Sequence, residues 1–83
     1  MLKLKFFASL REALGCSEEA LTVPSDVATL GLLRNHLAAR GGEWSRLTGS
    51  SSLRCAVNQE MAGDETALSD GDEVAFFPPV TGG

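Results

Sequence analysis

Several chemical features are scarce in this chain of 83 residues. Its two cysteines, Cys16 and Cys55, lie far apart and form no CxxC pair, and its single histidine is His36. No acid or nucleophile stands at a readable spacing from that histidine. The composition therefore argues against a disulfide framework, a metal site and a histidine-based catalytic centre. We expect two ordinary thiols and a half-exposed helix residue.

Motifs that carry enzyme chemistry are also missing. The sequence has no GxSxG elbow, no GxxxxGK[ST] phosphate loop, no GxGxxG after a strand and no HExxH. Asp70 and Asp72 flank Gly71, where aspartate is favoured by turn geometry rather than by acid and base chemistry. We therefore expect no active-site side chains in this chain.

Long apolar runs are absent as well. No stretch approaches the roughly 18 to 20 residues of a membrane span, and the first residues do not form a secretory signal. With 43% hydrophobic residues, the length suits one small globular domain. We expect a cytoplasmic protein that does not bind membranes.

Positive charge is absent from the C-terminal third, because no Lys or Arg follows Arg54 and the formal net charge is −4. This distribution disfavours binding to nucleic acid or to an anionic membrane and suits a basic protein partner. A merely solvated surface is the alternative interpretation. The acids beyond Arg54 are Glu60, Asp64, Glu65, Asp70, Asp72 and Glu73.

Alternating apolar residues predict short strands. Leu2, Leu4 and Phe6 share one face of the first strand, and Phe7 interrupts its polar face. The second strand stops at Pro24 and is expected to pair with the first. A turn at residues 58–59 joins the next two into a hairpin. The expected strands are residues 2–6, 19–23, 53–57, 60–62 and 73–77.

Two helical segments are predicted. Ser9 is the expected N-cap of a short turn over residues 10–14, and Thr29 that of a main helix running to about Arg40. Gly31 weakens this helix by up to about 1 kcal/mol relative to alanine. Residues 42–52 are expected to form a loop or short helical turn anchored by Trp44 and Leu47.

These elements predict an α+β fold, a mixed sheet of about five strands covered on one face by one main helix. If the first and last strands are central neighbours, a right-handed connection joins them through the helix. Phe7 and Phe77 then share the uncovered face.

The C-terminus carries the most informative pattern, Pro78 and Pro79 followed by Val80-Thr81 and Gly82-Gly83. The prolines end the last strand because they fix φ and lack an N–H. We divide the chain into a domain over residues 1–78 and an extended, flexible tail over residues 79–83, which reaches about 16 Å. Glycines without Cβ atoms can enter a slot too narrow for side chains. A terminus without function is the alternative.

The Gly83 carboxylate is the strongest candidate for chemistry in this chain. A carboxylate is a poor electrophile, so another protein would have to activate it, most simply as an acyl-adenylate made from ATP. Sulfur could then replace AMP, and the resulting thiocarboxylate is a good nucleophile that a carrier can present.

The chain resembles the small subunit of molybdopterin synthase, a family of MoaD-like sulfur carriers. The resemblance spans essentially the whole sequence, and its most specific part is the closing run. The segments that carry it are Leu4-Lys5-Phe6-Phe7-Ala8 with Arg11-Glu12, Leu33-Arg34-Asn35-His36-Leu37, Ala56-Val57-Asn58-Gln59, and residues 70–83.

This resemblance implies a ubiquitin-like β-grasp fold and a role in molybdenum cofactor biosynthesis. It implies that an E1-like adenylyltransferase uses ATP to adenylate Gly83, and that a sulfur-donating enzyme supplies the sulfur of the thiocarboxylate. The chain itself is expected to bind no cofactor and no metal. The large synthase subunit would then use the sulfur to convert cyclic pyranopterin monophosphate to molybdopterin.

The resemblance also implies contacts with the large subunit, in a heterotetramer of two small and two large subunits. Phe7, Met61 and Phe77 match positions of an apolar partner surface; completing a small core is the alternative role for them. The residues that would insert with Gly83 are Pro79, Val80, Thr81 and Gly82.

Two other functions fit a Gly-Gly terminus. The activated Gly83 could be joined to lysines, as in a ubiquitin-like protein modifier. A sulfur carrier of the thiamine pathway would share the fold and the tail. The segment Phe-Phe-Pro-Pro-Val-Thr that precedes the two glycines argues against this function.

Overall fold

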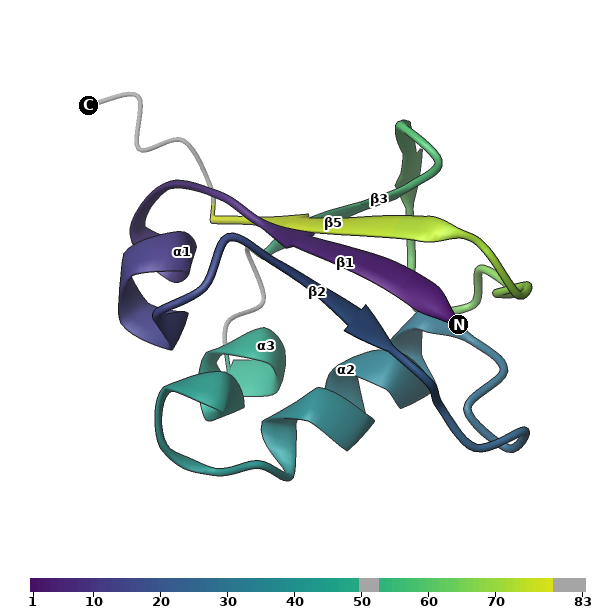
Figure 1. Ribbon diagram of the computed structural model, residues 1–83, viewed down its shortest axis with the longest axis horizontal. Coiled ribbons are helices and arrows are strands. Elements are labelled where there is room, and N and C mark those ends of the chain that lie inside the picture. Colours follow the sequence, from purple (N-terminus) through teal and green to yellow (C-terminus); the bar gives the residue numbers. More distant parts are fainter. Residues whose placement is uncertain (50–52, 79–83) are drawn as a thin grey trace.

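Five strands form one mixed sheet in the computed structural model, which describes residues 1–49 and 53–78 (Figure 1). The sheet order is β2-β1-β5-β3-β4, in which β1 and β5 are parallel and the other neighbours antiparallel. This arrangement is the ubiquitin-like β-grasp, so the predicted fold class is confirmed. The strands are β1 (Leu2–Phe6), β2 (Glu18–Leu21), β3 (Arg54–Val57), β4 (Glu60–Ala62) and β5 (Glu73–Phe77).

Helices cover one face of this sheet and leave the other open (Figure 1). The main helix is α2 (Leu30–Ala38), and the short elements η1 (Gly42–Ser45) and α3 (Arg46–Gly49) follow it. A further helix, α1 (Ala8–Leu14), connects β1 to β2. The covering layer is therefore built from several elements rather than from one helix. Within residues 1–49 and 53–78, no helix is long and apolar enough to cross a bilayer.

The core lies between the sheet and the helices. In β1 and β5 alternate side chains are buried, and the Phe6 and Phe76 rings stack with centroids 5.6 Å apart. Trp44 meets the Phe6 ring edge on, at 5.5 Å between centroids, which confirms the predicted anchoring role of Trp44. Leu47 is also fully buried, as expected. The buried leucines of α2 are Leu30, Leu33 and Leu37.

The start of α1 differs from the sequence prediction, because Phe7 rather than Ser9 occupies the N-cap position. No side chain caps this helix, and the Phe7 N–H donates to the Phe76 carbonyl at 3.2 Å. This bond extends the β1–β5 pairing to Phe7, so the helix begins at Ala8 with a positive φ of 54°. A bond to a distant strand therefore set the boundary, not the local capping preference.

Other boundaries shifted by one to two residues. β2 ends at Leu21 rather than at residue 23, β3 begins at Arg54 rather than at residue 53, and α2 ends at Ala38 rather than near Arg40. Fraying at the ends of elements explains differences of this size. The predicted β3–β4 hairpin at residues 58–59 is confirmed, with positive φ at both positions.

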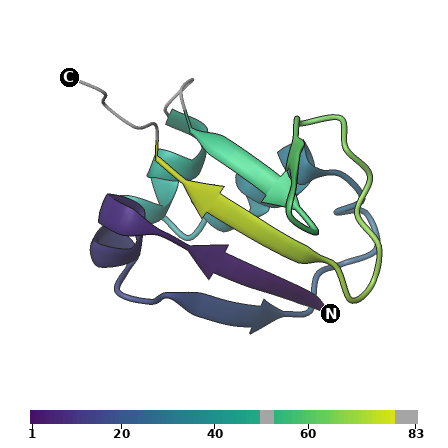
Figure 2. The ribbon, with the colours of Figure 1, turned by 90° about the horizontal axis from the view of Figure 1, so that it is seen from above.

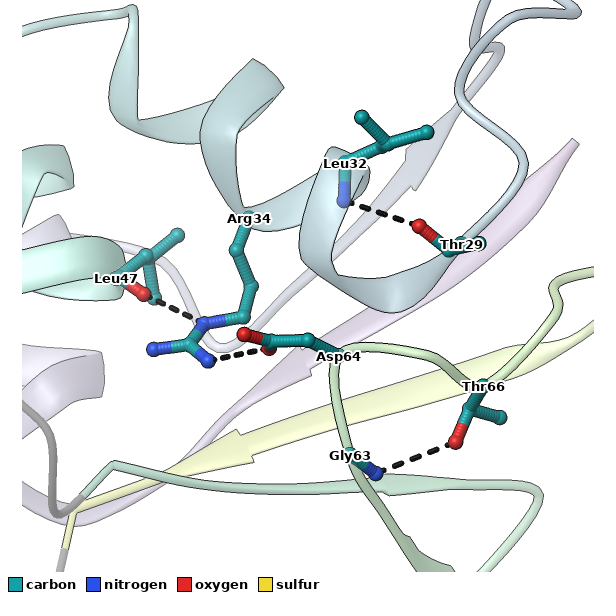
Figure 3. Close-up of polar contacts among 7 residues, drawn as sticks. All are labelled: Thr29, Leu32, Arg34, Leu47, Gly63, Asp64 and Thr66. Atoms are coloured by element: carbon teal, nitrogen blue, oxygen red, sulfur yellow. Dashed lines mark hydrogen bonds and ion pairs between the residues drawn. The ribbon is translucent and has the colours of Figure 1, made fainter.

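The first turn of α2 is held by the loop that follows β4 (Figure 3). The Leu30 and Gly31 N–H groups donate to the carbonyls of Thr66 and Asp64, at 2.9 and 3.0 Å. The Leu32 N–H donates to Oγ1 of Thr29, the predicted N-cap, at 3.3 Å. Three N–H groups that a helix start leaves unpaired are thereby satisfied.

Gly31 and Arg34 fix this loop against α2. A Cβ atom at Gly31 would lie 2.9 Å from the Cβ of Asp64, so only glycine permits this approach. Arg34 donates from Nε to the Leu47 carbonyl and from Nη1 to Asp64 Oδ1, both at 2.7 Å (Figure 3). One mostly buried side chain thus joins α2, α3 and the loop after β4.

Candidate functional site

The point where β5 ends is where the C-terminal tail joins the domain. Phe77 is the last residue of β5, and its Cα partner across the antiparallel pair is Arg54 at the start of β3. On the other side, α1 lies beside the end of β5 (Figure 2). Residues 79–83, which include every expected tail position and Gly83, lie outside the described residues. The site is therefore built from the residues that surround the root of the tail.

Phe7 and Phe77 are brought into contact there. Their ring centroids are 6.4 Å apart at an interplanar angle of 74°, an edge-to-face arrangement. Phe7 is 43% exposed and Phe77 is half-buried, so neither ring has become part of the core. The predicted sharing of the open face by these two residues is confirmed.

The pairing of the strands places Met61 on the same face as Phe7 and Phe77. Ala56 is the Cα partner of both Ala75 in β5 and Met61 in β4. Because alternate residues of a strand point to opposite faces, these three side chains stand opposite the buried Val74 and Phe76. Met61 is 61% exposed. We call the five residues Phe7, Ala56, Met61, Ala75 and Phe77 the apolar patch.

Charged side chains occupy much of the rest of the open face. Lys3 and Lys5 of β1 point to this side, and Lys5 lies 3.5 Å from the Glu73 carboxylate. Glu18 of β2 is the Cα partner of Lys5 and continues the row. The open face thus has an apolar part that includes the last residue of β5, and a charged part that runs across β2, β1 and the start of β5.

Neither cysteine is an activated nucleophile. Burial raises the pKa of the Cys55 thiol to about 11, and it also raises the pKa of the half-buried Cys16 thiol. A thiol is reactive as its thiolate, which both shifts disfavour. Both cysteines are free thiols. Their surroundings fit the expectation of ordinary thiols.

Asp70 and Asp72 hold a turn together. Asp72 accepts hydrogen bonds from the Asn58 side-chain amide at 3.0 Å and from the Ser69 N–H at 2.8 Å, which lower the pKa of its carboxyl. Asp70 pairs with the amino group of Met1. His36 is exposed on α2. Among the described residues, no group of three or more His, Cys, Asp or Glu side chains could hold a metal ion.

The sequence reasoning missed two members of the patch and one neighbour. Ala56 and Ala75 have small side chains and were not predicted as partner contacts. Their alternation with core residues along β3 and β5 nevertheless places them on the open face. Arg54 was recognised only as the last cation in the sequence. Its position opposite Phe77 follows from the β3–β5 register, which no local pattern reveals.

Curated relatives match the chain over its whole length. It is 46% identical to the molybdopterin synthase sulfur carrier subunit of Escherichia coli and 43% identical to that of Haemophilus influenzae, over 100% of each chain. It is also 37% identical to small archaeal modifier protein 3 of Haloferax volcanii, covering 99% of this chain and 98% of the relative.

Solved structures share the fold. The crystal structure of SAMP1 from Haloferax volcanii aligns over 99% of this chain and 98% of its own, with a TM-score of 0.83 and 33% identity. A complex of subunits 1 and 2 of molybdopterin-converting factor from Helicobacter pylori aligns over 99% and 97%, with a TM-score of 0.67 and 24% identity, which is evidence for the fold alone. The ThiS family matches residues 4–83. The chain therefore belongs to the ThiS family, and its similarity to molybdopterin synthase sulfur carrier subunits confirms the resemblance found in the sequence.

Proposed function

We propose that this chain is the sulfur carrier subunit of a molybdopterin synthase. The observation that carries the proposal is full-length identity of 46% and 43% to two proteins named as such subunits. Gly82-Gly83 also follow, after residues 78–81, the strand that contributes Ala75 and Phe77 to the apolar patch. The cytoplasm remains the compartment expected from the sequence.

The proposed chemistry takes place at Gly83. An E1-like partner would catalyse attack of the Gly83 carboxylate on the α-phosphorus of ATP, which releases pyrophosphate and leaves an acyl-adenylate. A sulfur nucleophile from a sulfur-donating enzyme would then attack the carbonyl carbon and displace AMP. With a persulfide as the nucleophile the product is an acyl disulfide, and a thiol would cleave its S–S bond to leave the Gly83 thiocarboxylate and a new disulfide. Two such carriers would each pass one sulfur to cyclic pyranopterin monophosphate to form the dithiolene of molybdopterin, and water would return each Gly83 to a carboxylate. ATP is used by the partner, so the chain needs no bound cofactor.

The apolar patch is the proposed contact with the large subunit. Phe7, Met61 and Phe77 keep large exposed or half-exposed side chains on the open face, around the root of the tail. Burying side chains of this kind stabilises a complex by roughly 1.5 to 3 kcal/mol each. Residues 79–82 would place Gly83 in the large subunit's substrate pocket, within a heterotetramer of two small and two large subunits.

Intact mass after reconstitution tests this function. The purified chain is incubated with ATP, an E1-like adenylyltransferase and a sulfur-donating enzyme. The expected result is a mass increase equal to the exchange of one oxygen for one sulfur, and formation of molybdopterin once the large subunit and cyclic pyranopterin monophosphate are added. A variant lacking Gly83 is the control and should keep its thermal stability. A chain that gains no sulfur under these conditions would refute the proposal.

Conjugation to lysines is the second candidate function. It is favoured by the 37% identity to small archaeal modifier protein 3 over nearly the whole chain. Both functions begin with the same activation of Gly83, so the fate of the acyl group separates them. Amide-linked conjugates in cell extracts, detected by mass spectrometry of lysine-containing peptides, would support the modifier. A carrier of the thiamine pathway would gain sulfur but would not support molybdopterin formation.

A further inference from the structure

Arg54 stands beside the root of the tail on the open face. It is the Cα partner of Phe77 in the antiparallel β3–β5 pair, so the two side chains lie on the same face with Cβ atoms about 5 Å apart. Phe7 packs against the other side of Phe77. Phe77 thus lies between the Phe7 ring on the β1 side and Arg54 on β3.

The charge of Arg54 is exposed and makes no ion pair with a carboxylate of residues 1–49 or 53–78. Arg34, Arg40 and Arg46 do form such pairs, with Asp64, Glu19 and Glu43 respectively. An exposed arginine at the edge of an apolar patch can pair with an anion of a partner. Among side chains, carboxylates fit the planar guanidinium fork best.

The length of the tail limits which anion Arg54 can contact. Six residues, from Pro78 to Gly83, follow Phe77, and an extended chain of that length spans roughly 20 Å. An arginine side chain is far shorter than this. When the tail is extended in a partner, Arg54 therefore cannot reach the phosphate of an adenylate formed at Gly83. In that arrangement Arg54 would instead lie against the protein surface of the partner that receives the tail.

We propose that Arg54 is a specificity-determining residue that pairs with a carboxylate of the large subunit at the mouth of the channel for the tail. The proposal rests on the proposed function. In such a position a charge at the rim of an interface acts mainly on the rate of association and on its salt dependence. Arg54 would select the correct partner and align the tail before it enters, while the apolar patch supplies most of the affinity.

Association kinetics with the purified large subunit test this assignment. The rate constant is measured by stopped flow or surface plasmon resonance at several salt concentrations, for the wild-type chain and for Arg54→Glu, Arg54→Lys and Lys3→Glu. Lys3→Glu is the matched control: it changes the net charge equally and lies on the same face, at the opposite end of β1. Circular dichroism melting checks that every variant folds.

The expected result is a decrease of about tenfold in the association rate for Arg54→Glu at low salt, with a weaker salt dependence. Arg54→Lys should keep most of the rate, and Lys3→Glu should change it little. Equal effects of Arg54→Glu and Lys3→Glu would indicate that only the overall charge of the chain affects association, and would refute a local ion pair at Arg54. Unchanged binding of Arg54→Glu would refute it as well. If the wild-type chain gains sulfur and binds, a null result at Arg54 refutes this inference alone. Failure of the wild-type chain to bind would refute the proposed subunit role as well.

Discussion

Phe7 and Phe77 meet edge to face with ring centroids 6.4 Å apart, although one follows the first strand and the other ends the last. The parallel pairing of β1 and β5 brings them together, and the Phe7 N–H bond to the Phe76 carbonyl extends that pairing. Both rings remain accessible at the position where the tail begins. A pair of accessible aromatics at one end of a sheet is typical of a binding surface.

Phe77→Asp should weaken association with the large subunit more than it destabilises the isolated domain. A half-buried ring contributes less to the fold than to an interface that covers it, and its loss there should cost about 1.5 to 3 kcal/mol of binding free energy. Titration calorimetry and thermal melting measure the two effects. Leu32→Asp is the matched control, because Leu32 is 45% exposed but lies on α2. Unaltered binding of Phe77→Asp would remove Phe77 from the interface.

Gly31→Ala should destabilise the domain, although helix propensity alone predicts a gain of up to about 1 kcal/mol. The new Cβ would lie 2.9 Å from Asp64 Cβ and 3.2 Å from its carbonyl oxygen. Forcing this contact apart should cost roughly 1 to 3 kcal/mol in urea unfolding. Gly63→Ala is the control, since a Cβ there meets nothing within 4 Å. A Gly31→Ala variant that is more stable than the wild-type chain would contradict this prediction and show that the loop around Asp64 moves to accommodate the methyl group.

Glu19→Gln should reduce stability at neutral pH and have less effect in acid. Hydrogen bonds from Arg40, at 2.9 and 2.5 Å, lower the pKa of the Glu19 carboxyl in the folded state. The unfolded chain therefore binds this proton more readily, and the contribution of the pair is lost as pH falls through the folded-state pKa. Urea unfolding at neutral and acidic pH should show a difference of about 1 kcal/mol or less that shrinks on acidification.

The double variant Glu19→Gln, Arg40→Gln provides the control for that pair. Once Arg40 is replaced, the Glu19 substitution should cost little at either pH. Arg40 also lies over the Trp44 ring, 4.4 Å from its centroid, so the Arg40 substitution carries an additional cost of its own. Equal costs of Glu19→Gln with and without Arg40 would show that the ion pair contributes nothing.

Cys16 should react with a thiol reagent before Cys55 does. Cys55 is 4% exposed and its thiol pKa is raised to about 11, so at mildly alkaline pH it is both covered and protonated. Cys16 is partly accessible. Alkylation followed by mass spectrometry of peptides measures the order, and a Cys16→Ser variant isolates the slow site. Labelling of Cys55 in that variant as fast as in urea would contradict its burial.

Local patterns predicted the strands and the main helix well. The alternation of Leu2, Leu4 and Phe6 marked β1, and Thr29 marked the start of α2, because these signals depend on neighbours in the chain. Ser9 failed as a cap since a bond between Phe7 and Phe76 decided the start of α1. The turn at residues 58–59 was predicted because asparagine tolerates positive φ.

Most contacts between distant segments could not be predicted. From the sequence, Gly31 is expected only to weaken the helix. The structure shows that glycine is needed at this position because Asp64 approaches the helix closely. Arg34 and Arg40 each join elements that only the packing of the helices against the rest of the fold brings together. The Phe7–Phe77 contact was accessible to sequence reasoning because both residues interrupt an alternating strand. Arg54 was not, because its importance depends on the β3–β5 register alone.

The central place of β5 has a mechanical consequence. The strand that carries the tail is hydrogen-bonded on both sides, to β1 and to β3. Tension applied to the C-terminus would act along β5 and load both ladders in shear, so many bonds would have to break together. An enzyme could therefore grip and draw the tail firmly without unravelling the domain that delivers it.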